Sequence, residues 1–311
     1  MSITVVGSIA VDTVMTPMGK RERMAGVAAT HVALAASFFD GVRVVGPAGD
    51  GFDLAPPVVA HTREINTEDV EHMRGATSVF WVGEYGWGLN SRDNLDEQLG
   101  VMRTLQPTLG YASRSADVLF LGNVQPTLQL HIREQCGAAR FVAMDSMSLW
   151  IDVARAELFD VIGRVDCVIL NDAELRQLTE CASLVAAAHE VLAWGPSVVV
   201  AKHGEYGATL VTSDDFFSLP AYPLESVVDP TGAGDTFAGG FVGYVARHLE
   251  RAGEVETLRQ AMAYGTALAS FNVQEFGTDR VARLTAAEIH DRVADLQAMT
   301  HFEHAPVELV G

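Results

Sequence analysis

The sequence of 311 residues is poor in positive charge: 21 Lys and Arg stand against 40 Asp and Glu, which gives a formal charge of −19. No run of Lys or Arg interrupts this excess, so binding to nucleic acid or to an anionic membrane is not expected. An anionic substrate would have to be held by local devices such as backbone amides, a helix N-terminus or a metal ion.

Cysteines and long hydrophobic runs are also scarce. Cys136, Cys167 and Cys181 have no CxxC spacing, which argues against a disulfide framework or a zinc site and favours a reducing cytoplasm. No apolar run approaches the roughly 18 residues of a membrane-spanning helix, and the first residues lack the features of a signal peptide. Neither a P-loop nor a Gly-x-Gly-x-x-Gly turn after a strand occurs, which disfavours a P-loop enzyme and a dinucleotide-binding enzyme. We therefore expect a cytoplasmic protein.

Hydrophobic residues make up 49% of the chain, and short β-rich runs alternate with helical stretches along most of it. The β-rich runs are almost continuously apolar, which is typical of strands covered on both faces. Expected strands are 3–7, 42–46, 117–122, 141–145, 167–170 and 198–201, and expected helices are 29–39, 126–136, 172–179, 184–194, 233–249 and 255–272. The alternation predicts one doubly wound α/β domain, residues 1–311, with a mostly parallel sheet flanked by helices.

Two segments interrupt this alternation. Residues 12–24 are short and polar, and residues 77–94 carry Trp81, Tyr85 and Trp87 among glycines. We interpret them as extra strands that form a small β lid, since ligand sites are often covered by mobile segments. Two surface loops are the alternative interpretation.

The most informative stretch is 228–240, VDPTGAGDTFAGG, where a β-rich segment passes through a glycine-rich turn into a long helix. At Gly232, Ala233 and Gly234 backbone amides can approach a phosphate closely, and the helix start adds partial positive charge. Asp235 places a carboxylate beside this anion site, which suits a base that takes the proton of an attacking hydroxyl. An ordinary glycine-rich helix start is the alternative.

The string DPTGAGDTFAGGF resembles the C-terminal signature of the ribokinase, or PfkB-type, carbohydrate kinase family. Residues 171–174 (NDAE) resemble its Asn-x-x-Glu motif, 201–208 its Gly-x-x-Gly nucleotide turn, and 44–50 its Val-Gly-x-x-Gly-Asp segment. Gly7, with Asp12 soon after, fits the usual start of the family. The resemblance implies a ribokinase-like fold and an enzyme that uses ATP and magnesium to phosphorylate a hydroxyl group.

By position, the resemblance makes Asp235 the general base and the turn Gly232, Ala233, Gly234 the anion hole for the transferring phosphoryl group. Asn171 and Glu174 would organise magnesium through water, as suits a hard ion that keeps several waters. An N-cap followed by Glu three residues later is also a helix-capping box, and both roles can coexist.

The resemblance further implies an ATP site. Its residues would be Lys202, Gly204, Gly207, Thr231, Phe271, Asn272 and Gly277. Gly204 and Gly207 are also compatible with a plain β-turn, and Phe271 and Asn272 with the end of an amphipathic helix. The resemblance is also compatible with a potassium ion bound near Asp229 and Thr231.

One family motif is altered. Where the family carries Gly-Gly-x-x-x-Asn, this chain reads GVAATH, so that Val27 replaces the second glycine and His31 the Asn that contacts substrate hydroxyls. We expect His31 to contact the phosphoryl acceptor, with a buried helix residue as the alternative. The expected acceptor site comprises Asp12, Gly26, His31, Tyr85 and Trp87.

These patterns predict an ATP-dependent kinase of a small sugar or polyol. A nucleoside kinase of the same fold is the alternative, because the lid aromatics could stack a base. A catalytically inactive regulator that binds a small molecule is a remote alternative. The family also admits a homodimer formed through the lid.

Overall fold

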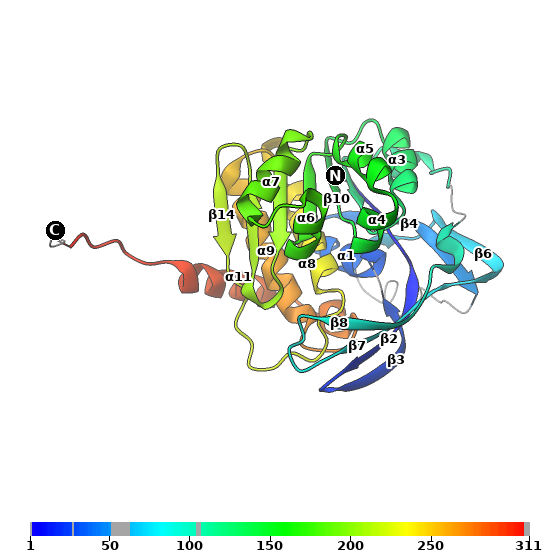
Figure 1. Cartoon of the computed structure of the whole chain (residues 1–311), viewed down its shortest axis with the longest axis horizontal. Coiled ribbons are helices and arrows are strands. Elements are labelled where there is room, and N and C mark those ends of the chain that lie inside the picture. The colour runs from blue at the N-terminus through cyan, green and yellow to red at the C-terminus, as the bar shows by residue number, and fades with distance from the viewer. Residues whose placement is uncertain (1, 27, 51–62, 104–106, 308–311) are drawn as a thin grey trace.

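The computed structural model describes residues 2–26, 28–50, 63–103 and 107–307, and Val27 of the altered motif lies outside them. Figure 1 shows a large sheet with helices on both faces and a smaller sheet across one end. Within the described residues the large sheet has ten strands, with β6 beside β4 and the others in the order β14-β13-β12-β11-β10-β9-β1-β4-β5. The strands are β1 (Ser2–Val6), β4 (Gly41–Asp50), β5 (Ile65–Asn66), β6 (Val70–Thr77), β9 (Val118–Leu121), β10 (Phe141–Met144), β11 (Cys167–Asn171), β12 (Val198–Lys202), β13 (Ala208–Val211) and β14 (Phe216–Leu219).

The predicted doubly wound architecture is confirmed, because β4, β1, β9, β10, β11 and β12 are mutually parallel. The hairpin β13–β14, which the sequence had not indicated, adds an antiparallel edge. The longer helices are α1 (Ala28–Ala36), α3 (Pro126–Gln135), α5 (Arg155–Ile162), α6 (Asp172–Thr179), α7 (Leu184–Ala193), α8 (Ala233–Arg247), α9 (Val255–Asn272) and α11 (Ala286–Thr300). Three short ones are α2 (Tyr111–Arg114), α4 (Ser148–Val153) and α10 (Asp279–Ala282).

The two largest apolar clusters of the described residues lie on opposite faces of the large sheet, because strand side chains alternate between its faces. Val118 and Phe120 of β9 pack with α1, α8 and α9 on one face. Leu119 and Leu121 pack with α3, α5, α6 and α7 on the other. None of the helices in the described part of the chain is long and apolar enough to cross a membrane.

The backbone of helix α8 packs directly against the backbones of α1 and α9, because glycines stand at the contacts. A Cβ on Gly239 would lie 2.4 Å from the carbonyl oxygen of Val32 in α1. A Cβ on Gly240 would lie 2.9 Å from the Cα of Gly265 in α9. This close packing fixes the start of α8, where Asp235 lies.

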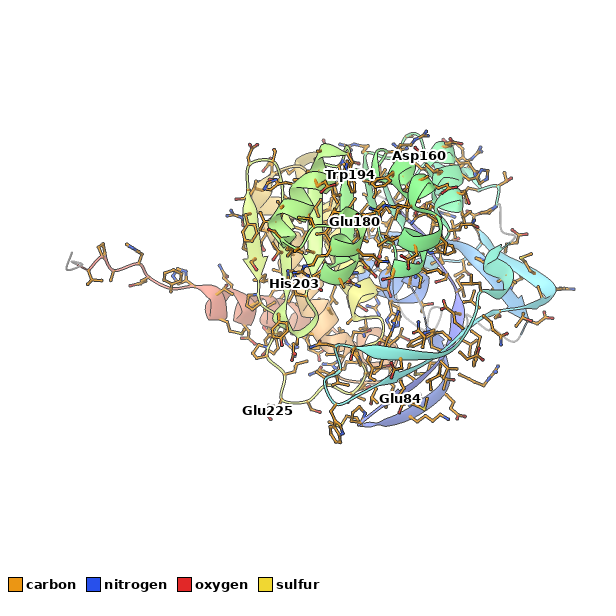
Figure 2. All side chains as sticks on the ribbon, in the orientation of Figure 1. Glu84, Asp160, Glu180, Trp194, His203 and Glu225 are labelled. Atoms are coloured by element: carbon orange, nitrogen blue, oxygen red, sulfur yellow. The ribbon has the colours of Figure 1, made fainter. Side chains whose placement is uncertain are left out.

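The smaller sheet, called the lid sheet below, has the order β3-β2-β7-β8. Its strands are β2 (Ala10–Thr16), β3 (Gly19–Gly26), β7 (Val79–Tyr85) and β8 (Arg92–Gln98). Strands are thus present in both segments that interrupted the α/β alternation. Val14, Trp81 and Tyr85 form a small apolar cluster on one face of this sheet. In Figure 2 the lid sheet, marked by Glu84, lies at the end of the molecule opposite Trp194.

Candidate active site

Three neighbouring strands of the large sheet end at the candidate site. β10, β11 and β12 are parallel and adjacent, so their carboxyl ends meet at one edge, where α/β proteins commonly bind ligands. Asp145 directly follows β10, whereas Asn171 and Lys202 are paired last residues of β11 and β12. The Nζ of Lys202 lies 3.2 Å from Oδ2 of Asp145, and both side chains are largely buried.

The site gathers more negative than positive charge in a poorly solvated place. Burial raises the pKa of Asp145 to about 6, although Lys202 works against the rise. Burial raises the pKa of Glu174 to about 7, and the charge of Asp145 adds to the effect. Burial alone would lower the pKa of Lys202, but Asp145, Glu174 and Asp235 together raise it. Such a group of carboxylates favours the binding of an additional cation.

The glycine-rich turn leads directly into α8. Gly232 is the N-cap with φ 75°, a left-handed conformation, and a Cβ there would lie 2.3 Å from the ring of His31. A Cβ on Gly234 would lie 3.0 Å from Nζ of Lys202, so this ammonium group lies against the turn. Asp235 follows in the first turn of α8, where amides lack intrahelical partners. Burial raises the pKa of Asp235, and Lys202 opposes the rise.

A buried hydrogen-bond network holds the turn from α1 and α9. Nδ2 of Asn272 donates to the carbonyl oxygen of Thr231 at 2.8 Å. Oδ1 of Asn272 accepts from the hydroxyl of Thr236 at 3.0 Å and is 2.9 Å from Nδ1 of His31. His31 is 2% exposed and Asn272 is 0% exposed. Both side chains lie in this network; the contacts of His31 match the alternative of a buried helix residue, and the expected roles of Asn272 at the adenine and of His31 at the acceptor stay predictions.

Asp229 is likewise fully buried before the turn. Its Oδ1 accepts from the amide of Thr231 at 2.8 Å, and its Oδ2 accepts from the amide of Gly277 at 3.1 Å. Phe271 is 3% exposed, and the guanidinium of Arg292 lies 3.9 Å from its ring centroid. Two residues expected to form the adenine pocket, Phe271 and Gly277, thus lie in packed surroundings, and Gly277 supports Asp229.

The Asn-x-x-Glu motif forms the capping box of α6. Oδ1 of Asn171 accepts from the amide of Glu174 at 2.7 Å, and Oε2 of Glu174 accepts from the amide of Asn171 at 2.9 Å. Among the described residues no three His, Cys, Asp or Glu side chains are close enough together to hold a metal ion directly. The carboxylate of Glu174 and the side-chain oxygen of Asn171 are of the ligand type that suits a magnesium ion that keeps several waters.

The expected nucleotide turn is the short 3₁₀ segment Gly204–Tyr206 and the following Gly207. Gly204 has φ 59° and Gly207 has φ 101°, and a Cβ on Gly207 would lie 2.1 Å from the carbonyl oxygen of Leu219. Glycine is needed at both positions for backbone reasons. His203, labelled in Figure 2, marks the start of this turn above the lid sheet.

The lid sheet contacts both parts of the site. Its β7–β8 turn reaches the nucleotide turn, where Nδ2 of Asn90 donates to Oε1 of Glu205 at 2.6 Å. The hydroxyl of Thr231 donates to the hydroxyl of Tyr85 at 3.3 Å, so Tyr85 lies over the glycine-rich turn. Trp87, which we expected at the acceptor, is 87% exposed at the tip of the hairpin.

At the base of the lid sheet, two residues expected to bind the acceptor lie together. Asp12 is 2% exposed on β2, and Gly26 ends β3. A Cβ on Gly26 would lie 2.0 Å from Oδ2 of Asp12, so glycine is required for this approach.

Sequence reasoning missed two charged residues of the site. Asp145 was seen only as the end of a strand, although its place at the carboxyl edge of a parallel sheet could have indicated a functional group. Arg92 lies on β8, all of whose residues are exposed, and no motif distinguishes it. Its charge nevertheless acts on Asp235 and Glu174.

The chain belongs to the pfkB family of carbohydrate kinases, because the model of that family matches residues 112–283, more than half of the sequence. It is 29% identical over 283 residues to a cytidine kinase of Thermococcus kodakarensis, covering 82% of this chain and 96% of that protein. The chain is therefore an ATP-dependent kinase of the sugar and nucleoside kinase class.

Two solved structures illustrate the shared fold. The Burkholderia thailandensis nucleoside kinase in complex with inosine has a TM-score of 0.72 and 19% identity, covering 95% of this chain and 99% of that one. Arabidopsis thaliana ribokinase complexed with ribose and ATP has a TM-score of 0.74 and 18% identity, covering 94% and 98%. At these identities the likeness establishes the ribokinase-like architecture alone.

Proposed function

We propose that this protein is a nucleoside kinase that transfers the γ-phosphoryl group of ATP to a primary hydroxyl of a nucleoside. The similarity to a cytidine kinase along nearly the whole of that protein carries the choice of acceptor. The lid sheet supports it, because the aromatic side chains of Trp81 and Tyr85 lie on one of its faces and Tyr85 contacts Thr231 of the glycine-rich turn. Asp12 and Gly26, at the base of the lid sheet, would bind the hydroxyls of the sugar moiety.

In the proposed reaction Asp235 accepts the proton of the attacking hydroxyl. Burial raises its pKa, which makes it a stronger proton acceptor than an ordinary carboxylate. Amides of the turn from Gly232 to Gly234 and the start of α8 would stabilise negative charge on the transferring group. Lys202, held against this turn by Asp145, would bind phosphate oxygens of the nucleotide.

Magnesium, when bound, would neutralise charge on the phosphates. Glu174 and Asn171 would hold it through water, since the capping box leaves Oε1 of Glu174 outside the hydrogen bonds of the cap. The raised pKa of Glu174 indicates a carboxylate that would gain stability from a nearby cation. Asp229 and Thr231 are retained as the candidate potassium site, which a comparison of potassium with sodium salts would test.

A direct assay tests the acceptor. The purified protein, with ATP and magnesium, would be offered cytidine, uridine, adenosine, inosine, ribose, fructose and inositol, and the phosphorylated products quantified. Stacking of a base is worth about 1–3 kcal/mol, so we expect a nucleoside to exceed ribose in kcat/KM by roughly 5- to 150-fold.

A sugar kinase is the second candidate. Asp12 at the acceptor site and Asp235, the proposed general base, would serve a free sugar as well as the sugar moiety of a nucleoside. A higher kcat/KM for ribose or fructose than for every nucleoside would establish it. No turnover with any compound would contradict both candidates.

A further inference from the structure

Gln129, on α3, is a polar residue in an apolar environment. It is 0% exposed, and its helix neighbours Leu128 and Ile132 belong to the apolar cluster on this face of the sheet. Burial of an amide is costly unless hydrogen bonds replace those that it makes with water. The cost is met here by backbone carbonyl groups at the edge of the sheet where the candidate site lies.

The side-chain amide of Gln129 joins the ends of two neighbouring strands, β9 and β10. Its Nε2 lies 2.9 Å from the carbonyl oxygens of Gly122 and Asp145 and 3.3 Å from that of Leu121. The β9–β10 ladder ends with the bond from the amide of Asp145 to the carbonyl oxygen of Leu121. Beyond that bond the strands separate, and Gln129 supplies a donor for the buried carbonyl groups that follow.

Asp145 connects this junction with the glycine-rich turn. Its backbone carbonyl is held by Gln129, and its carboxylate accepts from the amide of Ser146 and from Nζ of Lys202 at 3.2 Å. The same Nζ lies against the turn, because a Cβ on Gly234 would be 3.0 Å from it. A continuous series of contacts thus leads from the interior of α3 to the expected anion hole.

The position of Lys202 matters because several carboxylates attract it. The charges of Asp145, Glu174 and Asp235 all act on its ammonium group, and in the described part of the chain its ion pair is with Asp145. If Asp145 were displaced, Lys202 could move toward Asp235 and weaken the proposed base by stabilising its charged form. It could also move toward Glu174, where it would compete with magnesium. The place of Asp145 therefore decides which group the lysine serves.

We propose that Gln129 is a positioning residue for phosphoryl transfer: by fixing Asp145 it keeps Lys202 at the glycine-rich turn. A side chain buried in α3 then affects the reaction through two intervening residues, without contact to acceptor or nucleotide. The inference rests on the proposed kinase function and adds a supporting residue to its site. A purely structural role would be limited to satisfying the carbonyl groups at the strand ends.

The kinetic test is a double-mutant cycle of Gln129→Met and Lys202→Met, measured with ATP and cytidine. Methionine keeps the length of the glutamine side chain and removes its donors. A misplacement of about 1 Å can cost about 10²-fold in rate, so we expect Gln129→Met to lower kcat by roughly 10- to 100-fold. In the Lys202→Met background it should have little further effect, because the two residues act in one series. Losses that simply multiply would overturn the proposal.

Thr4→Val is the matched control. Thr4 is also 0% exposed, and its hydroxyl donates to the carbonyl oxygen of Ser113 in α2 at 3.0 Å, outside the active site. The variant therefore removes one buried side-chain donor, as Gln129→Met does. Its free energy of unfolding should fall, whereas its kcat should equal that of the wild type. An equal loss of kcat in Thr4→Val and Gln129→Met would overturn the proposal, because lost stability would then explain both.

A binding measurement keeps the inference separate from the proposed function. Calorimetry with magnesium and a non-hydrolysable ATP analogue needs no acceptor, and the affinity should fall in Gln129→Met and Lys202→Met but persist in Thr4→Val. Equal affinity in Gln129→Met and the wild type would overturn the role of Gln129 while leaving the kinase intact. Absence of binding to the wild type would contradict the proposed function itself. If Gln129→Met does not fold, Gln129→Asn replaces it, because its shorter amide stays polar but falls short of the carbonyl groups.

Discussion

The burial of His31 leads us to expect that the free energy of unfolding falls in acid. Its imidazole is buried between α1, α9 and the glycine-rich turn, and burial lowers its pKa from 6.5 to about 4, against the smaller opposing effects of Asp229 and Asn272. The folded protein therefore holds it neutral at a pH where the unfolded chain protonates it. The unfolded state binds more protons below pH 6.5, so the stability due to His31 is complete above 6.5 and is lost as the pH falls toward 4.

The magnitude follows from the two pKa values. The pKa of His31 is 6.5 in the unfolded chain and about 4 in the folded protein. At about 1.4 kcal/mol for each pKa unit, this difference corresponds to a full loss of roughly 3 kcal/mol in the free energy of unfolding. By about pH 5 roughly 2 kcal/mol of this should be lost relative to about pH 7.5. A loss of that size is large compared with the marginal stability of about 5–15 kcal/mol of most proteins.

The assay is equilibrium unfolding in urea at about pH 7.5 and about pH 5. His31→Asn is the variant, because its amide keeps a donor for Oδ1 of Asn272 and does not titrate. Between the two pH values, the free energy of unfolding of the wild type should fall by roughly 2 kcal/mol more than that of His31→Asn. His301→Asn, in the exposed C-terminal segment, is the control and should follow the wild type. Parallel losses in wild type and His31→Asn would refute the buried, neutral His31.

The same variant separates two roles of His31. If His31 only holds the turn, His31→Asn should lower kcat by a similar factor for every acceptor. If it contacts the acceptor, as the altered family motif suggested, the ranking of acceptors should change.

Two other variants test the proposed chemistry. Asp235→Asn should remove most turnover, because general-base catalysis contributes about 10²–10⁴-fold, while ATP binding measured by calorimetry stays nearly the same. Activity close to that of the wild type would exclude Asp235 as the base. Glu174→Gln should shift the magnesium titration of the rate to higher concentration, whereas the amide oxygen can still accept from Asn171 and preserve the helix cap. An unchanged titration would leave Glu174 with the capping role alone.

Local sequence signals predicted most of the strands of the large sheet and most of the longer helices that flank it. The boundaries of α6 and α9 agree with the expected 172–179 and 255–272, because a capping box starts the first and hydrophobic periodicity defines the second. The parallel strands were visible as short apolar runs. The hairpin β13–β14 was not, because its second strand, Phe216–Leu219, is short and largely exposed.

The site was harder to predict because its contacts join distant parts of the chain. His31 and Asn272 are separated by 241 positions, and nothing local to either residue indicates the partner. The family resemblance placed His31 at the acceptor and Asn272 at the adenine, and the structure shows that the two side chains also contact each other under the turn. Arg92 was invisible for a similar reason, since its place depends on strand pairing with Tyr85 and on the support of Trp81.

The charges of the proposed site favour a role for the lid sheet beside that of the glycine-rich turn. Asp145, Glu174 and Asp235 lie around a single ammonium group, that of Lys202, in a chain with a formal charge of −19. A nucleotide triphosphate would add further negative charge, which a helix N-terminus offsets by only about half an elementary charge. In the proposed reaction, further positive charge would come from magnesium beside Glu174 and from Arg92 on β8, whose charge acts on Asp235 and Glu174. Tyr85 and Asn90 connect the lid sheet to the glycine-rich turn and to the nucleotide turn, so the lid sheet covers the proposed site. In the proposed reaction this cover would keep water away from the transferring group and so favour phosphoryl transfer over hydrolysis.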